Sequence, residues 1–276
     1  MPKIDVNKKR GYKASAPVEK IWGNIESGAM DGSLCVPLGE DVKKRDIYLN
    51  LKTGLHILAA GEALSGVGMF RRVTLATLLK FNNADDLKFI LIDSLHISFF
   101  DFKNIDERLV LPIVTQNDKA IEAFEWLNKE MSQRYETLKI SKYRTIDDYN
   151  KNNSSKKMPH IVLILTELGE LIDYDKKAYE LILRILQMSK CVGIHLILTT
   201  QWLSRNTIRA TILANTPTKI VFKSGSKEGS AAILSRPGAE ELLGQGDMIV
   251  ESNCWLGSKR LQGYYIAEEV ISKTVF

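Results

Sequence analysis

One stretch of the sequence, residues 55–68, constrains the fold more than any other. It reads LHILAAGEALSGVG: an apolar run ends at Gly61, a second glycine follows at Gly66, and helical spacing begins near residue 69. A strand, a loop bounded by glycines at the G-x-x-x-x-G spacing, and a helix form the context that a phosphate-binding loop needs. The bare spacing is a weak signal, because a simple glycine turn gives the same pattern.

The two positions after the second glycine lack the chemistry of a working phosphate loop. A lysine and a serine or threonine are expected there, and the sequence has Val67 and Gly68. The lysine would bring a positive charge to the β- and γ-phosphates, and the hydroxyl would bind Mg²⁺. Backbone N–H groups can still hold phosphates, but losing one aimed electrostatic contact typically lowers a rate by ~10²–10³. The candidate nucleotide-binding residues are Gly61, Glu62, Ala63, Leu64, Ser65, Gly66, Val67 and Gly68.

Composition sets broad limits on the class of protein. The 276 residues are 45% hydrophobic and 26% charged, which is typical of a soluble globular domain. Three widely separated cysteines form no CxxC pair, so we expect a reducing compartment and a cytoplasmic location. No apolar run reaches membrane-spanning length, and the N-terminus does not resemble a signal peptide. The net charge of +5 is compatible with nucleic-acid binding but does not indicate it.

Apolar runs alternate with helical patterns along most of the chain. We expect strands at residues 36–41, 47–51, 55–60, 88–93, 160–165, 193–200, 219–222, 247–250 and 261–266. We expect helices at residues 69–80, 117–138, 176–190 and 204–213, two short helical segments between 222 and 247, and an exposed loop at 139–157. Several of the strands are continuously apolar, which is typical of strands buried on both faces. The sequence therefore predicts an α/β fold with a mostly parallel sheet and helices on both faces.

The first 30 residues are polar and basic, and we expect them to form a partly ordered arm. They either contact phosphate groups or form a solvated terminus, the latter being the more common outcome. Arg71 and Arg72 lie in the first turns of the helix after the loop and are candidates to replace the missing lysine. Because they lie several positions into the helix, we expect them to point along it and away from the loop.

Seven motifs occur in an order and spacing that match a known family. They are PLGED at residues 37–41, HILAAG at 56–61, FILID at 89–93, EMSQRY at 130–135, GIHLILTTQ at 193–201, ANTPTKIVF at 214–222 and GAEELLGQGDM at 238–248. With a Tyr149-Asn150 pair, they resemble the motor domains of the FtsK/SpoIIIE family, RecA-like translocases of double-stranded DNA. The resemblance implies a RecA-like motor domain at residues 36–276, preceded by a lead-in at 1–35.

The resemblance also implies a site and its partners. The family hydrolyses ATP with Mg²⁺ between the subunits of a hexameric ring and moves duplex DNA through the ring. Glu167 matches the glutamate that polarises the attacking water, and Gln201 matches the sensor glutamine. The aspartate that orients Mg²⁺ falls on Thr166, which could hold a metal-bound water only weakly. A family arginine falls on Ala231, and an arginine-proline pair falls on Trp202-Leu203.

The motifs that carry the fold are thus kept, and those that carry the chemistry are largely lost. We expect a hydrolysis-impaired motor domain in a homo- or hetero-oligomeric ring, with Glu167 as either a remnant of the catalytic site or a helix-capping acid. A working translocase that uses Arg71 or Arg72 is one alternative. A protein-interaction module, like the degenerate repeats of type VII-like secretion ATPases, is another. For that module Trp202, Leu203 and Trp255 are candidate apolar contacts, although core packing is the more common role of a tryptophan.

Overall fold

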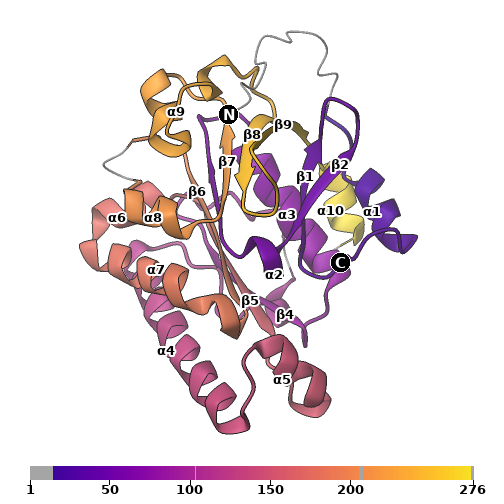
Figure 1. Ribbon diagram of the computed structural model, residues 1–276, viewed down its shortest axis with the longest axis vertical. Coiled ribbons are helices and arrows are strands. Elements are labelled where there is room, and N and C mark those ends of the chain that lie inside the picture. Colours follow the sequence, from indigo (N-terminus) through magenta and orange to yellow (C-terminus); the bar gives the residue numbers. More distant parts are fainter. Residues whose placement is uncertain (1–14, 103, 205–207, 275–276) are drawn as a thin grey trace.

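The structure is a computed structural model that describes residues 15–102, 104–204 and 208–274 (Figure 1). The strands are β1 (Cys35–Glu40), β2 (Asp46–Asn50), β3 (Ile57–Ala60), β4 (Leu87–Ile92), β5 (His160–Leu165), β6 (Ile194–Thr200), β7 (Thr218–Phe222), β8 (Asp247–Ser252) and β9 (Ser258–Gly263). The α-helices are α1 (Glu19–Glu26), α2 (Leu51–Gly54), α3 (Val67–Phe81), α4 (Asn117–Ser141), α5 (Ile146–Asn152), α6 (Leu168–Tyr174), α7 (Lys176–Met188), α8 (Ala210–Asn215), α9 (Lys227–Leu234) and α10 (Glu268–Thr274). Short 3₁₀ turns are η1 (Asp106–Arg108), η2 (Ser154–Lys156), η3 (Ser189–Val192) and η4 (Ala239–Glu241).

All nine strands of the described residues belong to one sheet, which has a parallel and an antiparallel half. The strand order is β2-β1-β9-β8-β7-β3-β6-β5-β4. β7, β3, β6, β5 and β4 run parallel, and the remaining strands are added beside β7 by antiparallel pairing. β3 lies between β6 and β7, so the loop at its carboxyl end is flanked by the ends of both neighbours. In open α/β sheets this edge is where ligands bind.

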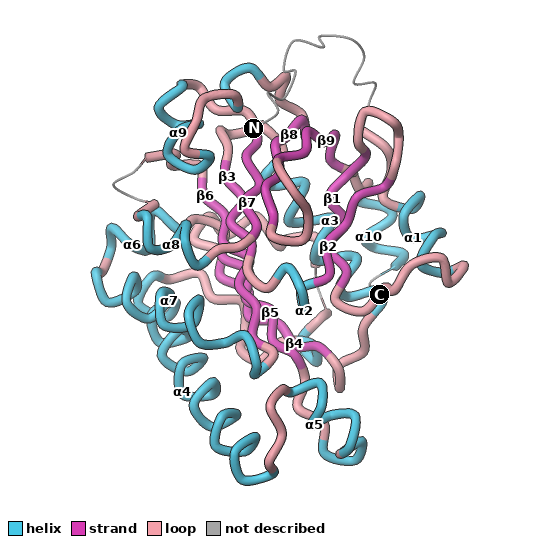
Figure 2. Tube along the Cα trace, viewed as in Figure 1, coloured by secondary structure: helices cyan, strands magenta, loops and turns pink. Residues whose placement is uncertain are grey.

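Successive side chains of the parallel strands point to opposite faces of the sheet and pack in two separate hydrophobic cores. Leu58 and Leu163 point to one face, where they pack with α4, α6 and α7. Ile57 and Val162 point to the opposite face and pack with α1 and α3. Figures 1 and 2 show the same division, with α4, α6, α7 and α8 on one side of the sheet and α1, α3 and α10 on the other. Since strands buried on both faces are typical of parallel sheets, the predicted α/β fold class is confirmed.

Part of the basic N-terminal segment is folded onto the domain. α1 buries Ile21 and Trp22, and the Trp22 indole Nε1 donates to Thr77 Oγ1 of α3 at 2.8 Å. Residues 1–14, which carry most of the basic side chains of the expected arm, lie outside the described residues. A boundary between residues 35 and 36 therefore stays a prediction. None of the described helices is both long and apolar enough to span a membrane.

The expected loop at residues 139–157 is wrong, because most of this segment is helical. α4 continues to Ser141 and ends where Lys142 adopts a left-handed conformation with φ 60°. Thr145 then caps α5 by accepting a hydrogen bond from the Asp148 N–H. Of the α5 residues only Ile146 is buried, so the polar composition of this short surface helix looks like that of a loop.

Two further helices differ from the prediction. The helix expected at residues 204–213 begins at Ala210 as α8; residues 205–207 lie outside the described residues. α6 was not expected, because it is only seven residues long and follows β5 directly. Its position matters for the site, since its first turn begins immediately after Thr166 and Glu167.

Candidate functional site

The loop between β3 and α3 turns back over the carboxyl end of β3, and both of its glycines have a packing reason. A Cβ on Gly61 would lie 2.6 Å from the Phe222 Cβ of β7. A Cβ on Gly66 would lie 2.8 Å from the backbone of Gly246, and its φ of +130° is rarely adopted by other residues. The G-x-x-x-x-G spacing therefore reflects close contact between this loop and the segments around β7 and β8.

Backbone hydrogen bonds hold the loop in place. The Glu62 N–H donates to the Lys223 carbonyl at 2.9 Å, and the Gly246 N–H donates to the Ser65 carbonyl at 2.8 Å. Inside the loop, the Ser65 hydroxyl donates to the Glu62 carbonyl at 2.6 Å. α3 begins directly after Gly66, and the first N–H groups of an α-helix have no partner within the helix. The backbone part of an anion-binding site is thus present.

The side chains of the loop supply no cation. Glu62, Ala63 and Leu64 are exposed, Leu64 to 97%. Val67, at the position of the expected lysine, is 4% exposed and packs in the core that contains α1 and α3. Gly68, at the position of the expected hydroxyl, opens onto solvent.

Thr166 and Glu167 end β5 beside the loop and are both buried. The Thr166 carbonyl accepts from the Thr199 hydroxyl at 2.8 Å, whereas its own Oγ1 has no partner among the described residues. Glu167 caps α6, because its Oε1 accepts from the Gly169 N–H at 3.2 Å. The same carboxylate accepts from the Thr200 hydroxyl and, at 2.8 Å, from the Gln201 N–H. The structure therefore brings Glu167 and Gln201 together, through the Gln201 backbone.

Burial raises the pKa of Glu167, and three hydrogen bonds and the charge of Arg71 oppose the rise. Both carboxylate oxygens are occupied by donors from the protein. In this arrangement the Glu167 side chain caps α6 and links the end of β5 to the end of β6.

The structure adds a charged residue that the sequence analysis placed wrongly. Arg71 does not point along α3 away from the loop. Its guanidinium Nη1 donates to Thr199 Oγ1 at 2.8 Å and lies 3.4 Å from the Thr166 carbonyl, while Nη2 donates to Ser98 Oγ at 3.3 Å. The reason is general: helical side chains tilt toward the helix N-terminus, so a residue one turn into α3 leans back toward the loop.

Arg71 is 6% exposed, and two buried carboxylates compensate its charge. Burial lowers the pKa of Arg71, and the carboxylates of Asp93 and Glu167 oppose that shift. Asp93 follows β4 at the same edge, and its Oδ2 accepts from the Ser98 N–H at 2.7 Å. Arg72 points elsewhere and forms an ion pair with Asp101 at 2.7 Å.

Magnesium, which the family resemblance implies, does not fit these side chains. Mg²⁺ requires oxygen ligands in near-octahedral geometry. Gly68 offers no oxygen from a side chain, Thr166 offers only a neutral hydroxyl, and Glu167 already accepts three hydrogen bonds from the protein. Asp93 is the one carboxylate of this group with an unpartnered oxygen among the described residues, and its charge already acts on Arg71. The Arg71 guanidinium adds a like charge to the same place. Within the described residues, no group of three or more His, Cys, Asp or Glu side chains is arranged to hold a metal.

An apolar cavity of about 230 Å³ lies beside the loop on the β8–β9 side. It is lined by Leu64, Gly66 and Phe70 from the loop and α3, and by Gly246 and Tyr264 from the opposite wall. A planar ring fits such a cavity by apolar contact. This cavity could not be predicted from the sequence, because its walls come from segments that lie far apart in the chain.

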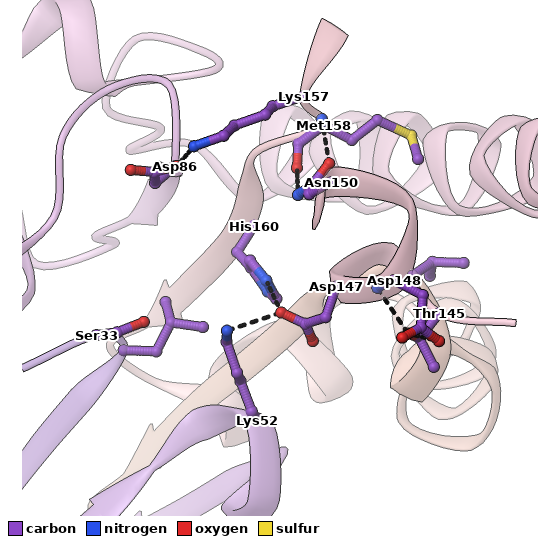
Figure 3. Close-up of polar contacts among 12 residues, drawn as sticks. Ser33, Lys52, Asp86, Thr145, Asp147, Asp148, Asn150, Lys157, Met158 and His160 are labelled. Atoms are coloured by element: carbon purple, nitrogen blue, oxygen red, sulfur yellow. Dashed lines mark hydrogen bonds and ion pairs between the residues drawn. The ribbon is translucent and has the colours of Figure 1, made fainter. Parts of the chain in front are cut away.

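A second, polar cavity of about 380 Å³ lies at the amino edge of the parallel strands. Figure 3 shows its side chains paired with one another: Asp147 lies between Lys52 and His160, and Lys157 reaches Asp86. The hydrogen bond with His160, together with Lys52, lowers the pKa of Asp147. Its charged groups are therefore neutralised inside the protein.

The expected core packing of the tryptophans is wrong for Trp202. This side chain is 49% exposed at the carboxyl edge, whereas Trp255 is partly buried against the core. Leu64 and Ile97 are also exposed in segments that follow β3 and β4 at this edge. Single exposed apolar side chains are common, and these three are candidates for contact with a partner.

Together, the parallel sheet, the glycine-bounded loop after its central strand and the helix that follows define a P-loop ATPase fold of the RecA-like class. Residues 26–205, more than half of the chain, match the FtsK/SpoIIIE family. The chain belongs to this family.

Curated relatives agree. The chain is 34% identical over 251 residues to the DNA translocase FtsK of Chlamydia trachomatis, which covers 86% of this chain and 31% of that protein. It is 34% identical over 246 residues to the DNA translocase FtsK of Helicobacter pylori, covering 88% of this chain and 29% of that protein. The chain thus spans about a third of the length of these relatives.

Solved structures show the same fold at lower identity. The conjugation coupling protein TcpA of pCW3, a monomer form with ATPγS, gives a TM-score of 0.77 at 22% identity and covers 89% of this chain and 71% of that one. The cytoplasmic domain of the type VII secretion ATPase EccC of Thermomonospora curvata gives 0.81 at 21%, covering 95% and 34%. These similarities concern the fold alone.

Proposed function

We propose that this chain is a pseudo-ATPase subunit of a cytoplasmic ring that acts on double-stranded DNA. It holds a nucleoside triphosphate at the loop without hydrolysing it at the rate of the family's motors. The observation that carries this proposal is the contrast between backbone and side chains at one site. The loop keeps its backbone conformation, and the N-terminus of α3 follows it directly. Val67, Gly68 and Thr166, however, provide neither the cation nor the metal ligands of a hydrolytic site.

The magnitudes favour a large loss of activity. Removing one aimed contact in a catalytic site typically costs ~10²–10³ in rate. Three such groups are absent here, and groups that act as a unit are not additive, so we expect a loss of about 10³-fold or more. Glu167, the one acidic residue retained, accepts hydrogen bonds from the protein on both oxygens, which opposes a role in activating water.

Nucleotide binding is supported by two features of the structure. The N-terminus of α3 and the loop backbone can bind phosphates without a side-chain cation. The apolar cavity next to the loop offers a place for a base. A relative of the same fold carries ATPγS, which supports the same assignment by similarity.

Duplex DNA and a hexameric ring are supported by membership of the family and by relatives described as DNA translocases. The net charge of +5 is compatible with a polyanionic partner. Because this chain spans about a third of those relatives, the translocation they carry out is a proposal for it.

The test is ATP turnover by the purified chain, with and without duplex DNA. We expect no turnover above background in either case. Turnover at rates normal for the family's motors would overturn the proposal. If such turnover occurred and was abolished in Arg71→Ala but not in Arg72→Ala, the chain would instead be a working motor with an unusual cation.

A second candidate function is a protein-interaction module, which the exposed apolar side chains at the carboxyl edge favour. Trp202, Leu64 and Ile97 would contact an apolar segment of a partner protein. Duplex-DNA affinity measured at several salt concentrations separates the two candidates. A surface that contacts phosphates loses affinity steeply as salt rises, whereas an interaction module binds little DNA at any salt concentration.

A further inference from the structure

Arg71 lies between the two positions at which a family motor anchors its metal ion. An added Cβ on Gly68 would lie 3.8 Å from the Arg71 Nη2. On the other side, Nη1 lies 3.4 Å from the Thr166 carbonyl. The positions of the missing hydroxyl and the missing aspartate therefore flank one guanidinium.

The charges around the guanidinium match this placement. Asp93 is 2% exposed and Glu167 is 7% exposed, and both carboxylates attract the Arg71 cation. Buried carboxylates next to a triphosphate repel it unless a cation lies between them. In a family motor the metal ion meets that need; here a cation that belongs to the protein occupies the same corner.

Around the Arg71 guanidinium, protein contacts alone leave several buried polar atoms without a hydrogen-bond partner. Arg71 Nε, Thr166 Oγ1 and Asp93 Oδ1 are all buried and have no hydrogen-bond partner among the described residues. Buried polar atoms without a partner are rare in folded proteins and indicate a missing water, ion or ligand. Two of the three can donate a hydrogen bond to an anionic oxygen.

We propose that the guanidinium of Arg71 replaces Mg²⁺ at this site, so that the chain binds a nucleoside triphosphate without a divalent metal. The inference rests on the nucleotide binding proposed above and adds how the site holds the charge. A guanidinium carries one positive charge and donates hydrogen bonds in a fixed plane, which suits phosphate oxygens. It cannot supply the second charge or the bound water of a metal ion, and this agrees with the loss of hydrolysis.

Calorimetric titration with ATPγS, in buffer with Mg²⁺ and in buffer with EDTA, tests the inference. For the unmodified chain we expect dissociation constants that agree within about twofold in the two buffers. Arg71→Ala should weaken binding in EDTA by about 10- to 100-fold, the range for losing a charged hydrogen-bond donor. Arg72→Ala is the matched control: it removes the neighbouring arginine, whose partner is Asp101, and should leave both constants unchanged.

A second variant reports on the metal directly. Replacing the guanidinium and restoring both anchors, in Arg71→Ala with Gly68→Ser and Thr166→Asp, should create a site for Mn²⁺ that electron paramagnetic resonance detects. Binding is read as a loss of the signal of free Mn²⁺, which the unmodified chain should leave unchanged at the same Mn²⁺ concentration. Circular dichroism and urea unfolding check that each variant folds; if Arg71→Ala does not, Arg71→Lys keeps the charge and should bind more weakly in both buffers while remaining independent of metal.

The outcomes separate this inference from the proposed function. Binding to the unmodified chain that Mg²⁺ strengthens tenfold or more overturns the role of Arg71 and leaves nucleotide binding intact. Equal affinities of the unmodified chain and Arg71→Ala in EDTA also overturn it. Absence of binding in either buffer overturns the proposed nucleotide binding itself.

Discussion

The two edges of the parallel half of the sheet both collect polar side chains, but they satisfy them differently. At the amino edge, His56, His160 and His195 come together, and all six ring nitrogens have a partner. At the carboxyl edge, Arg71 Nε and Thr166 Oγ1 are buried without one among the described residues. The histidine network at the amino edge finds its partners within the protein, whereas these two atoms at the carboxyl edge are free to bind a ligand.

The tautomers at the amino edge follow from its carbonyl and amide partners. The Leu55 carbonyl accepts from His195 Nδ1, and His195 Nε2 lies 3.1 Å from His160 Nδ1. His56 Nδ1 accepts from the Leu196 N–H at 3.0 Å, so its Nε2 donates to the Ser189 hydroxyl. A fully satisfied buried network of this kind stabilises one packing arrangement.

The largest effect that we expect concerns pH and the amino edge. Burial lowers the pKa of His56 to about 4, and burial next to other histidines lowers the pKa of His195 well below its usual value. Between pH ~6.5 and ~4 the unfolded chain binds protons that the folded chain excludes, so stability is full above ~6.5 and falls as the pH drops. His56 alone should cost about 3 kcal/mol over that window.

Urea unfolding at a series of pH values measures this loss. His96→Gln, which changes an exposed histidine after β4, is the control and should not alter the slope. A free energy of unfolding that stays constant from pH 7 to pH 4.5 would contradict the description of the amino edge.

The next effect concerns the loop at the carboxyl edge. Gly66→Ala should lower the free energy of unfolding by about 2–3 kcal/mol, because the new Cβ would meet the Gly246 backbone at 2.8 Å and a φ of +130° is strained. Gly68→Ala is the matched control, since it lies in the first turn of α3 and its Cβ would make only an ordinary contact, 3.8 Å from the Arg71 Nη2; it should be neutral or stabilising by up to about 1 kcal/mol. Equal effects in thermal unfolding would show that packing does not explain the glycine spacing.

Two substitutions that each remove one buried hydroxyl, one at the amino edge and one at the carboxyl edge, should change the free energy of unfolding by different amounts. Ser189→Ala removes the partner of His56 Nε2 and of the Ile194 carbonyl, so we expect a loss of about 1–3 kcal/mol. Thr166→Val removes a buried hydroxyl for which the described part of the chain offers no partner, so we expect little change or a gain of about 0.5–1 kcal/mol. Both are read by urea denaturation at pH 7.5, and a large loss in Thr166→Val would show that its hydroxyl is already satisfied.

The smallest effect should come from the rim of the polar cavity. Lys157 pairs with Asp86 at 2.9 Å, and both side chains are about 40% exposed. Surface pairs of this kind contribute little, so Lys157→Ala should change the free energy of unfolding by less than about 0.5 kcal/mol. A larger loss in the melting experiment would mean that the amino edge depends on its outer charges as well as on its buried histidines.

Most of the fold could be predicted from patterns that are local in the chain. The apolar runs from residue 88 to 93 and from 160 to 165 correspond to β4 and β5, because a strand buried on both faces needs an apolar side chain at nearly every position. α5 could not be predicted in this way, since its single buried residue, Ile146, gives no helical period.

The site was predictable only in part, for a related reason. The loop from Gly61 to Gly68 and the pair Thr166-Glu167 were found because motifs keep their residues close together in sequence. Arg71 was placed wrongly because its partners, Ser98 and Thr199, are 27 and 128 residues away, and no sequence period reports such contacts.

The sequence by itself determined which chemical groups the site can and cannot offer, because Val67, Gly68 and Thr166 are fixed covalently and no fold can restore a missing amine or carboxylate. It also determined the family, since the order and spacing of motifs survive without knowledge of contacts. Only the tertiary structure decided that Arg71 meets Thr199 beside Thr166, and that three distant histidines share one network. Those contacts depend on the strand order and on the direction in which the Arg71 side chain leaves α3. They form because the sheet brings distant segments of the chain to the same edge.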